Sequence, residues 1–349
     1  MEFLLEYGLF LVKSITVLAS LLIVIVVVAG LGHRNKQVDK GHIEVKSLND
    51  AVDNITHGLK QMVLDPQARK IEFKSEKKKA KEERKTRKKE ANEGTAPRDR
   101  VFVLEFEGDI QASAVTGLRE EVTAILSIAG EKDEVVVRLE SSGGMVHSYG
   151  LAASQLLRIV SRKIPLTVAV DKIAASGGYM MACIGTKIIA APFALLGSIG
   201  VVAQIPNFHR LLKNKDIDVE VLTAGQYKRT LTMFGENTEK GREKFIDQLE
   251  DVHALFKEFV SENRPVVDTE KVATGEAWYG KRALDLNLVD DLMTSDEYII
   301  DKCTDCDVFI VKYIEHQSRV DKLVDRFTHI WHRFSGVDLL RKELGPFTF

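Results

Sequence analysis

The feature that most constrains the fold of this chain is a regular alternation of strand-like and helix-like segments that begins at residue 100. The strand-like runs read VFVLEFEG (101–108), EVVVRLESSGG (134–144), IPLTVAVD (164–171) and TKIIAAP (186–192). Helix-like segments with apolar residues at helical spacing lie between them, over 114–128, 147–162 and after residue 176. Such alternation is typical of parallel βαβ units whose sheet is covered on both faces. The sequence therefore predicts an α/β fold.

Two further elements are expected beyond this core. DVEVLTAG (218–225) has the composition of a strand that ends at a glycine. Residues 237–263 form a long amphipathic pattern, which predicts a helix. Its apolar positions are Phe245, Leu249, Leu255, Phe256 and Phe259.

The N-terminal region contains a stretch that is long enough to cross a membrane. Residues 15–31 carry no charge, and the apolar stretch extends backward if Lys13 reaches the interface, which gives roughly the 20 residues that a bilayer core needs. We expect an uncleaved, single-pass anchor over residues 1–40. The alternative is a cleaved signal peptide. Basic residues after the span favour a cytoplasmic body, and a periplasmic body stays open.

Residues 41–99 are expected to form a charged, amphipathic helical segment and a linker. A helix is predicted to begin near Ser47, and the run 69–89 contains twelve basic and four acidic residues. That run either contacts anionic membrane lipid or is a solvated spacer, and the spacer is the simpler interpretation. Nucleic acid is not an expected partner, because the run has a single aromatic residue for stacking, Phe73.

Composition sets limits on the class of protein. The chain has 349 residues with a formal net charge of −2, and its apolar and charged fractions are those of a globular protein. The three cysteines do not indicate a disulfide framework. Cys303 and Cys306 form a C-x-x-C pair that lacks the two further ligands of a zinc site, so we expect a structural role for them and no bound metal.

Two glycine-rich turns follow predicted strands and could carry chemistry. In LESSGGMV (139–146), a Gly-Gly turn can point backbone N–H groups at an oxyanion or a phosphate. In VAVDKIAASGGYMMACIG, Ser176 lies between two alanines and two glycines at the start of a helix. Ser176 is either a nucleophile or an N-cap, and an N-cap is the commonest role of a serine at that place.

A nucleophilic serine needs a base. The histidine candidates are His147, His209 and His253, and no carboxylate stands out as an orienting partner for any of them. A lysine also serves when burial lowers its pKa. The lysine candidates are Lys172, Lys187 and Lys228. The first two end predicted strands, whereas Lys228 lies in the glycine-led loop TAGQYKRTLT.

Five segments together resemble the SohB branch of the signal peptide peptidase A family. They read LESSGGMVHSYGLAASQL, VDKIAASGGYMMA, APFALLGSIGVVAQ, TAGQYKRTLT and ATGEAWYGKRALDLNLVDDL. The resemblance covers about residues 100–295, and the N-terminal span and charged helix fit the same branch. The combination of ASGGYMMA with GQYKR is specific, and this resemblance is what singles out Lys228.

The resemblance implies a ClpP/crotonase-like fold of stacked ββα units over residues 100–300, followed by a C-terminal extension, 301–349. It implies hydrolysis of peptide bonds through an acyl-enzyme, without a metal or organic cofactor. Carried over by position, Ser176 is the nucleophile, Lys228 the general base, and Gly144 and Gly177 the oxyanion donors. Relatives assemble as membrane-facing homo-oligomeric rings or domes, and in some of them the serine and lysine come from neighbouring subunits.

Two positions depart from the family pattern. Ser142 stands where relatives often have proline in the S-P-G-G turn, and Asn287 stands where they often have glycine before LVD. Asparagine tolerates the left-handed backbone, so we expect the second turn to survive. Two other functions stay open: a crotonase-like enzyme acting on a thioester, and a catalytically silent membrane scaffold.

Overall fold

The computed structural model describes residues 6–18, 20, 41–75, 78, 82 and 98–315. The chain divides into two compact units, residues 1–42 with 315–349 and residues 43–314, and the fold described below is that of the second unit. Most of the expected span over 15–31 lies outside the described residues. Among the helices that are described, none is both long and apolar enough to cross a membrane.

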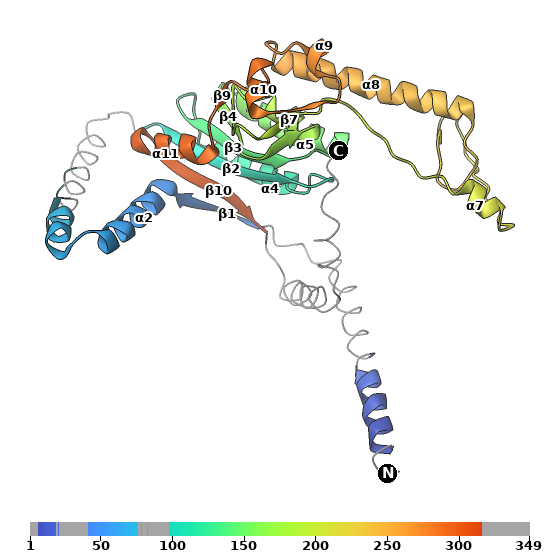
Figure 1. Cartoon of the computed structure of the whole chain (residues 1–349), viewed down its shortest axis with the longest axis horizontal. Helices are drawn as coiled ribbons and strands as arrows, with labels where there is room; N and C mark the ends of the chain where they lie inside the picture. The colour runs from blue at the N-terminus through green and yellow to red at the C-terminus, as the bar shows by residue number, and fades with distance from the viewer. Residues whose placement is uncertain are drawn as a thin grey trace. The chain divides into compact units, whose positions relative to one another are not determined.

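One ten-stranded sheet organises the body (Figure 1). Its main path runs β1 (His42–Ser47), β10 (Asp307–Ile314), β2 (Arg100–Gly108), β3 (Glu134–Ser141), β4 (Leu166–Val170), β6 (Lys187–Ala190) and β9 (Asp291–Leu292). Every pair from β10 to β9 along this path is parallel. The predicted α/β fold with parallel strands is confirmed. The sheet also reaches beyond residues 100–300, because β1 and β10 belong to it.

Alternation along the strands gives the sheet two apolar faces. In β2, Phe102, Leu104 and Phe106 lie in the larger hydrophobic cluster, whereas Val101 and Val103 lie in a second cluster with Ile299, on α11. Successive strand residues point to opposite faces, so a continuous apolar run serves both. All five residues of β4 are buried for the same reason.

Helices pack on both faces of this sheet, and one short helix lies on a segment that leaves it. They are α2 (Leu48–Val63), α4 (Val115–Leu126), α5 (Val146–Val160), α6 (Gly177–Ala182), α7 (His209–Lys213), α8 (Glu239–Asn263), α9 (Thr269–Val272), α10 (Gly280–Asp285) and α11 (Ser295–Asp305). Buried residues of α4, α5, α6 and α8 share the larger cluster, while α11 and the start of α2 contribute to the second. The helices expected over 114–128, 147–162 and 237–263 are thereby confirmed.

A short side branch of the sheet was not expected. Between β4 and α6 the chain forms β5 (Ile173–Ala175), which pairs in parallel with both β3 and β7 (Leu195–Gly197). β7 in turn pairs antiparallel with β8 (Ala277–Tyr279). The sequence predicted a turn directly into the helix here, because three residues are too few for a visible strand pattern.

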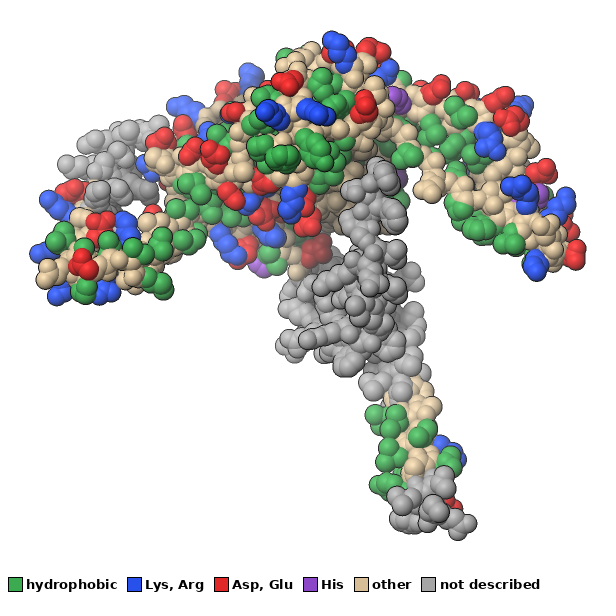
Figure 2. Space-filling model, viewed as in Figure 1, with side chains coloured by type: hydrophobic (Ala, Val, Ile, Leu, Met, Phe, Trp, Pro, Cys, Tyr) green, Lys and Arg blue, Asp and Glu red, His purple; other side chains and the backbone are tan. Residues whose placement is uncertain are grey.

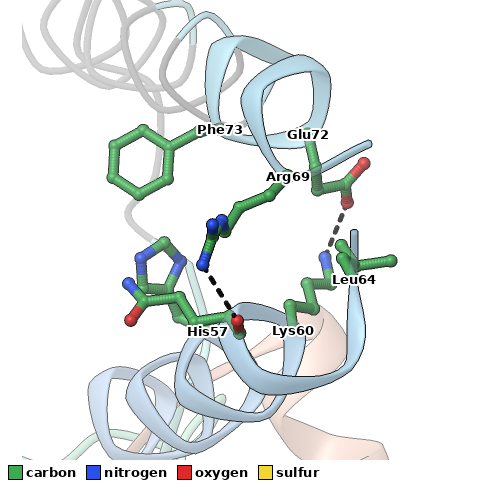
Figure 3. Close-up of a pocket in the computed structure, with 7 residues that line it drawn as sticks. His57, Lys60, Leu64, Arg69, Glu72 and Phe73 are labelled. Carbon is green, nitrogen blue, oxygen red and sulfur yellow. Dashed lines mark hydrogen bonds and ion pairs between the residues drawn. The ribbon is translucent and has the colours of Figure 1, made fainter. Parts of the chain in front are cut away.

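The N-terminal segment of this unit forms a helical hairpin. Ser47 caps α2 as predicted, since its side chain accepts a hydrogen bond from the N–H of Asp50. Asp65 then caps a second helix, over 66–75, by accepting from Gln67 N and Ala68 N, and those bonds lower its pKa. An ion pair of 2.8 Å between Lys60 and Glu72 joins the two helices (Figure 3).

A long arm, residues 201–252, leaves the body after β7 and contains α7 and the first half of α8 (Figure 1). Within 201–234, where every residue is described, no side chain is buried. The strand expected over 218–225 is wrong: these residues have no regular secondary structure. A single extended segment is unstable without a partner strand, and in this chain the arm runs beside none.

The sequence also made predictions for the turn at Asn287 and for the pair Cys303 and Cys306. Asn287 adopts the left-handed backbone with φ of 58°, so the turn survives without glycine as predicted. Cys303 and Cys306 are free thiols that pack against the second cluster, and burial raises the pKa of both.

The C-terminal end of α8 is held to the body by one buried guanidinium. Arg264, with only 6% of its side chain exposed, donates to Asn287 O at 2.8 Å and pairs with Asp290 at 2.9 Å. Asp290 also accepts from Ile188 N at the start of β6. Arg264 therefore ties α8, β6 and the turn before β9 together.

We expect Arg264→Ala to lower the free energy of unfolding by about 2–3 kcal/mol, because it leaves buried acceptors and a partly buried carboxylate without a partner. Arg242→Ala is the matched control on the same helix. Arg242 is exposed and pairs only with Glu239, so its loss should change stability by less than about 0.5 kcal/mol. Urea unfolding of the full chain measures both, and equal effects would contradict the prediction.

Candidate active site

The register of two parallel strands brings the predicted site residues together. Ser141, the last residue of β3, lies opposite Ala174 of β5. β3 continues into the Ser142–Gly144 turn, and β5 continues into Ser176. Carboxyl ends of parallel strands meet at one edge of a sheet, which is where α/β proteins place their ligand sites. The glycine turn and Ser176 therefore lie side by side.

Ser176 has a backbone conformation that is rare for a residue other than glycine. Its φ is 52° and its ψ is −118°. The conformation is held by a 2.8 Å hydrogen bond from Ser176 N to Gly197 O and by α6, whose Met180 N donates to Ser176 O. Strained positions of this kind cluster at functional sites. The hydroxyl makes no capping hydrogen bond with α6, so the N-cap role expected for a serine here does not occupy it.

The glycine turn is fitted closely against Ser176. Gly143 has φ of 89°, and a Cβ added there would lie 2.8 Å from Ser176 Cβ and from Gly177 N. A Cβ on Gly144 would overlap Ile110 O, which accepts a hydrogen bond from Met145 N. Only glycine allows these two close approaches. The turn over Ser142–Gly144 keeps this close fit although Ser142 stands where relatives often have proline.

Two backbone N–H groups remain available beside Ser176. Gly143 N donates to Ser141 Oγ at 3.0 Å and is therefore engaged. In the part of the chain that the structure describes, Gly144 N and Gly177 N have no hydrogen-bond acceptor. Gly177 is the first residue of α6, where an unpaired N–H is expected. These are the two amides assigned to an oxyanion hole on the family resemblance.

A chain of hydrogen bonds under the turn supports both glycines. Gly143 N donates to Ser141 Oγ, which contacts Tyr149 Oη at 2.5 Å, and Tyr149 donates to Asp109 O at 2.8 Å. Burial raises the pKa of Tyr149, so its hydroxyl stays protonated. The ring of Tyr149 also lies directly beneath Gly177. Tyr149 could not be recognised from the sequence, because its place in the apolar pattern of α5 is that of an ordinary core residue.

Ser176 and the glycine turn open into a cleft of about 680 Å³. Its other walls are Val146, Ser198, residues 200–202, His253 of α8, and Thr274 with Gly275. Among the residues that the structure describes, no aspartate, glutamate, lysine or arginine lines it. The cleft is therefore an uncharged channel with one imidazole.

The structure does not bring Lys228 to Ser176 within this chain. Lys228 is exposed on the arm and is not a lining residue of the cleft. The other lysine candidates are ion-paired: Lys172 with Glu140 at 2.8 Å and Lys187 with Asp291 at 3.8 Å. The hydrogen bond that Lys172 donates to Glu140 raises the pKa of Lys172, which opposes a role as a base.

Of the three histidine candidates, the structure places one in the cleft. His147 is exposed, His209 begins α7 on the arm, and His253 lines the cleft. His253 precedes the buried Phe256 and Val260 by three and seven residues. That spacing puts all three on one face of the helix and could have identified His253 from the sequence.

The buried thiol of Cys183, on the C-terminal side of α6, is not a second nucleophile for this site. Burial raises the pKa of the Cys183 thiol to about 12, so it does not form a thiolate at neutral pH. Among the described residues there is no cluster of histidine, cysteine and carboxylate side chains that could hold a metal ion.

Comparison with known proteins identifies the class. The description "Peptidase family S49 N-terminal" matches residues 2–156, and "Peptidase family S49" matches residues 158–307. The chain therefore belongs to peptidase family S49, which confirms the resemblance drawn from the motifs.

Within that family the chain is similar to proteins described as probable protease SohB. It is 48% identical over 337 residues to one from Haemophilus influenzae, which covers 94% of this chain and 95% of the relative. It is 46% identical over 306 residues to one from Buchnera aphidicola subsp. Schlechtendalia chinensis, with 86% and 100% covered.

A solved structure of the 1510-N membrane-bound stomatin-specific protease, a mutant in complex with a substrate peptide, is also similar. The match has a TM-score of 0.37 and 15% identity, and it covers 67% of this chain and 100% of that chain.

We expect Gly177→Ala to disrupt the site, because its Cβ would overlap the Tyr149 ring, which has no room to move. Stability should fall by about 1–3 kcal/mol, and any peptidase activity should fall with it. Gly150→Ala in α5 is the matched control, since nothing lies within 4 Å of its new Cβ. That change should stabilise the chain by about 0.5–1 kcal/mol. Thermal unfolding compares the two, and a tolerated Gly177→Ala would contradict the assignment.

Proposed function

We propose that this protein is a membrane-anchored serine endopeptidase that uses Ser176 as its nucleophile and Lys228 as its general base. The observation that carries the proposal is the Ser176 hydroxyl, which is free of capping bonds and lies in a cleft beside two unpaired amides. Membership of peptidase family S49 supports peptide hydrolysis. The ClpP/crotonase-like version of the α/β fold is part of this proposal and is supported by the β5–α6 and glycine-turn arrangement.

The proposed reaction has two balanced halves. Neutral Lys228 takes the proton of Ser176 as Oγ bonds to the carbonyl carbon, and the carbonyl electron pair moves to an oxyanion held by Gly144 N and Gly177 N. The oxyanion then collapses, the C–N bond breaks, and the lysine ammonium protonates the leaving amine. Water attacks the acyl-enzyme in the same manner and releases Ser176.

We assign Lys228 to the Ser176 of a neighbouring copy. In one chain Lys228 is exposed on the arm, away from the cleft lining. A lysine acts as a base only when desolvation lowers its pKa, and packing of the arm against a second copy supplies that desolvation. This arrangement explains why a single chain keeps the nucleophile and the base apart.

The arm has the surface that such an assembly requires. Figure 2 shows hydrophobic side chains gathered on the arm, with charged side chains along its outer edge. Leu211, Leu222 and Phe234 are 58%, 89% and 48% exposed. Apolar patches of this kind mark interfaces in soluble domains, and a homo-oligomeric ring or dome buries them.

The proposed substrates are signal-peptide-like or misfolded peptides at a bacterial inner membrane. A single N-terminal span and lipid contacts of the basic segment anchor the enzyme there. We expect the globular body to lie on the cytoplasmic side of the membrane. An extended peptide would lie along residues 200–202, whose backbone makes no hydrogen bond with another described segment.

Fluorophosphonate labelling tests the nucleophile. The parent protein should be labelled on Ser176, and Ser176→Ala should lose both the label and at least about 10³-fold of peptidase activity. Peptide mapping of the labelled protein identifies the residue. Labelling elsewhere with full activity of Ser176→Ala would contradict the proposal, and cleavage of an acyl thioester without labelling would favour a crotonase-like enzyme instead.

Co-expression of two inactive variants tests the shared site. Ser176→Ala and Lys228→Met should each be inactive alone. Mixed oligomers should recover about a quarter of the parent rate, because half of the serines and half of the lysines remain intact. Lys228→Arg alone should be as inactive as Lys228→Met, since arginine stays protonated and cannot accept the serine proton. Failure of every mixture to recover activity would place the pair within one chain.

A further inference from the structure

One buried polar atom in the cleft has no partner. His253 Nε2 is shielded from solvent and, among the residues that the structure describes, makes no hydrogen bond. Native proteins satisfy nearly all buried polar atoms, so an orphan of this kind in a binding cleft calls for an explanation. The proposed reaction does not use this imidazole.

The place of His253 on α8 explains why its ring faces the cleft. Phe256 and Val260, on the same side of the helix, are the residues of α8 buried in the body. Towards the N-terminus of α8, beyond His253, no side chain is buried, and the helix runs out along the arm (Figure 1). His253 is thus the last residue of the packed stripe, at the point where α8 leaves the body.

The surroundings of the ring limit what can bind it. The other cleft-lining groups are backbone, small hydroxyls and valines, and none is charged. Val202 is 90% exposed, and within the described part of the chain the backbone of residues 200–202 makes no hydrogen bond. An ionic ligand would find no counter-charge here. A neutral hydrogen-bonding chain, such as peptide backbone, matches both the valine walls and the orphan nitrogen.

We propose that His253 is a substrate-positioning residue, whose imidazole rotates to bring the shielded Nε2 to the cleft surface, where it hydrogen-bonds the main chain of an extended peptide with its scissile bond at Ser176. The inference rests on the proposed peptidase function and adds a contact that the Ser/Lys reaction does not include. It assigns the imidazole to binding, whereas activation of Ser176 stays with the lysine.

Peptide binding tests the contact without any chemistry. In the full-length Ser176→Ala protein, anisotropy of a fluorescein-labelled, uncharged Ala/Val/Ser peptide measures the dissociation constant. Adding His253→Phe, which keeps the ring and removes both nitrogens, should weaken binding about tenfold, equivalent to 1.4 kcal/mol. His253→Gln, which keeps a hydrogen-bonding atom, should recover most of the affinity. His147→Phe is the matched control on an exposed histidine and should leave affinity unchanged.

Two further readouts separate positioning from other roles. With Ser176 intact, His253→Phe should be labelled by a small fluorophosphonate within about twofold of the parent rate, because that probe does not need the peptide contact. Its unfolding temperature should be unchanged or higher, since the orphan nitrogen is removed.

Unchanged peptide affinity in His253→Phe overturns the inference. Loss of fluorophosphonate labelling also overturns it and makes His253 part of the nucleophile's activation. A lower unfolding temperature with unchanged affinity assigns the ring a purely structural role. If the parent itself is not labelled, the serine peptidase proposal fails, whereas the binding comparison still decides whether His253 holds a peptide.

Discussion

The site depends on one pairing, that of Ser141 in β3 with Ala174 in β5. This register places the ends of two parallel strands at one edge, so that the Gly143–Gly144 turn and Ser176 meet without further adjustment. Everything beneath them maintains that contact: Tyr149 supports Gly177 from below, and Ser141 holds Gly143 N. The strained backbone conformation of Ser176 persists only because the packed core around it holds the chain in place.

The body and the arm have different physical characters, and the proposed chemistry is divided between them. The body contains the buried parallel strands, the strained serine and the available amides. The arm buries nothing of its own over residues 201–234 and carries Lys228. A segment with exposed apolar side chains and no core gains stability from a partner surface. α8 spans both parts, and Arg264 fixes its packed end.

Sequence patterns predicted the elements that have a strong period or a clear cap. The apolar runs of β2, β3 and β4, the N-cap Ser47 and the left-handed Asn287 all follow from local chemistry. β5 was missed because three residues carry no period. The strand expected at 218–225 was wrong because composition reports a preference for extended backbone, whereas a strand also requires a neighbour to pair with.

The sequence by itself determined which groups are available: a serine at a helix start, a Gly-Gly turn, a basic loop with Lys228, and the family they indicate. These follow from local residue order, which the chain carries wherever it folds. Only the tertiary structure decided which groups meet. It joined the turn to Ser176, kept Lys228 apart within one chain, and turned the imidazole of His253 into the cleft. Contacts between distant residues depend on strand register and helix packing, and neither is encoded in any short window.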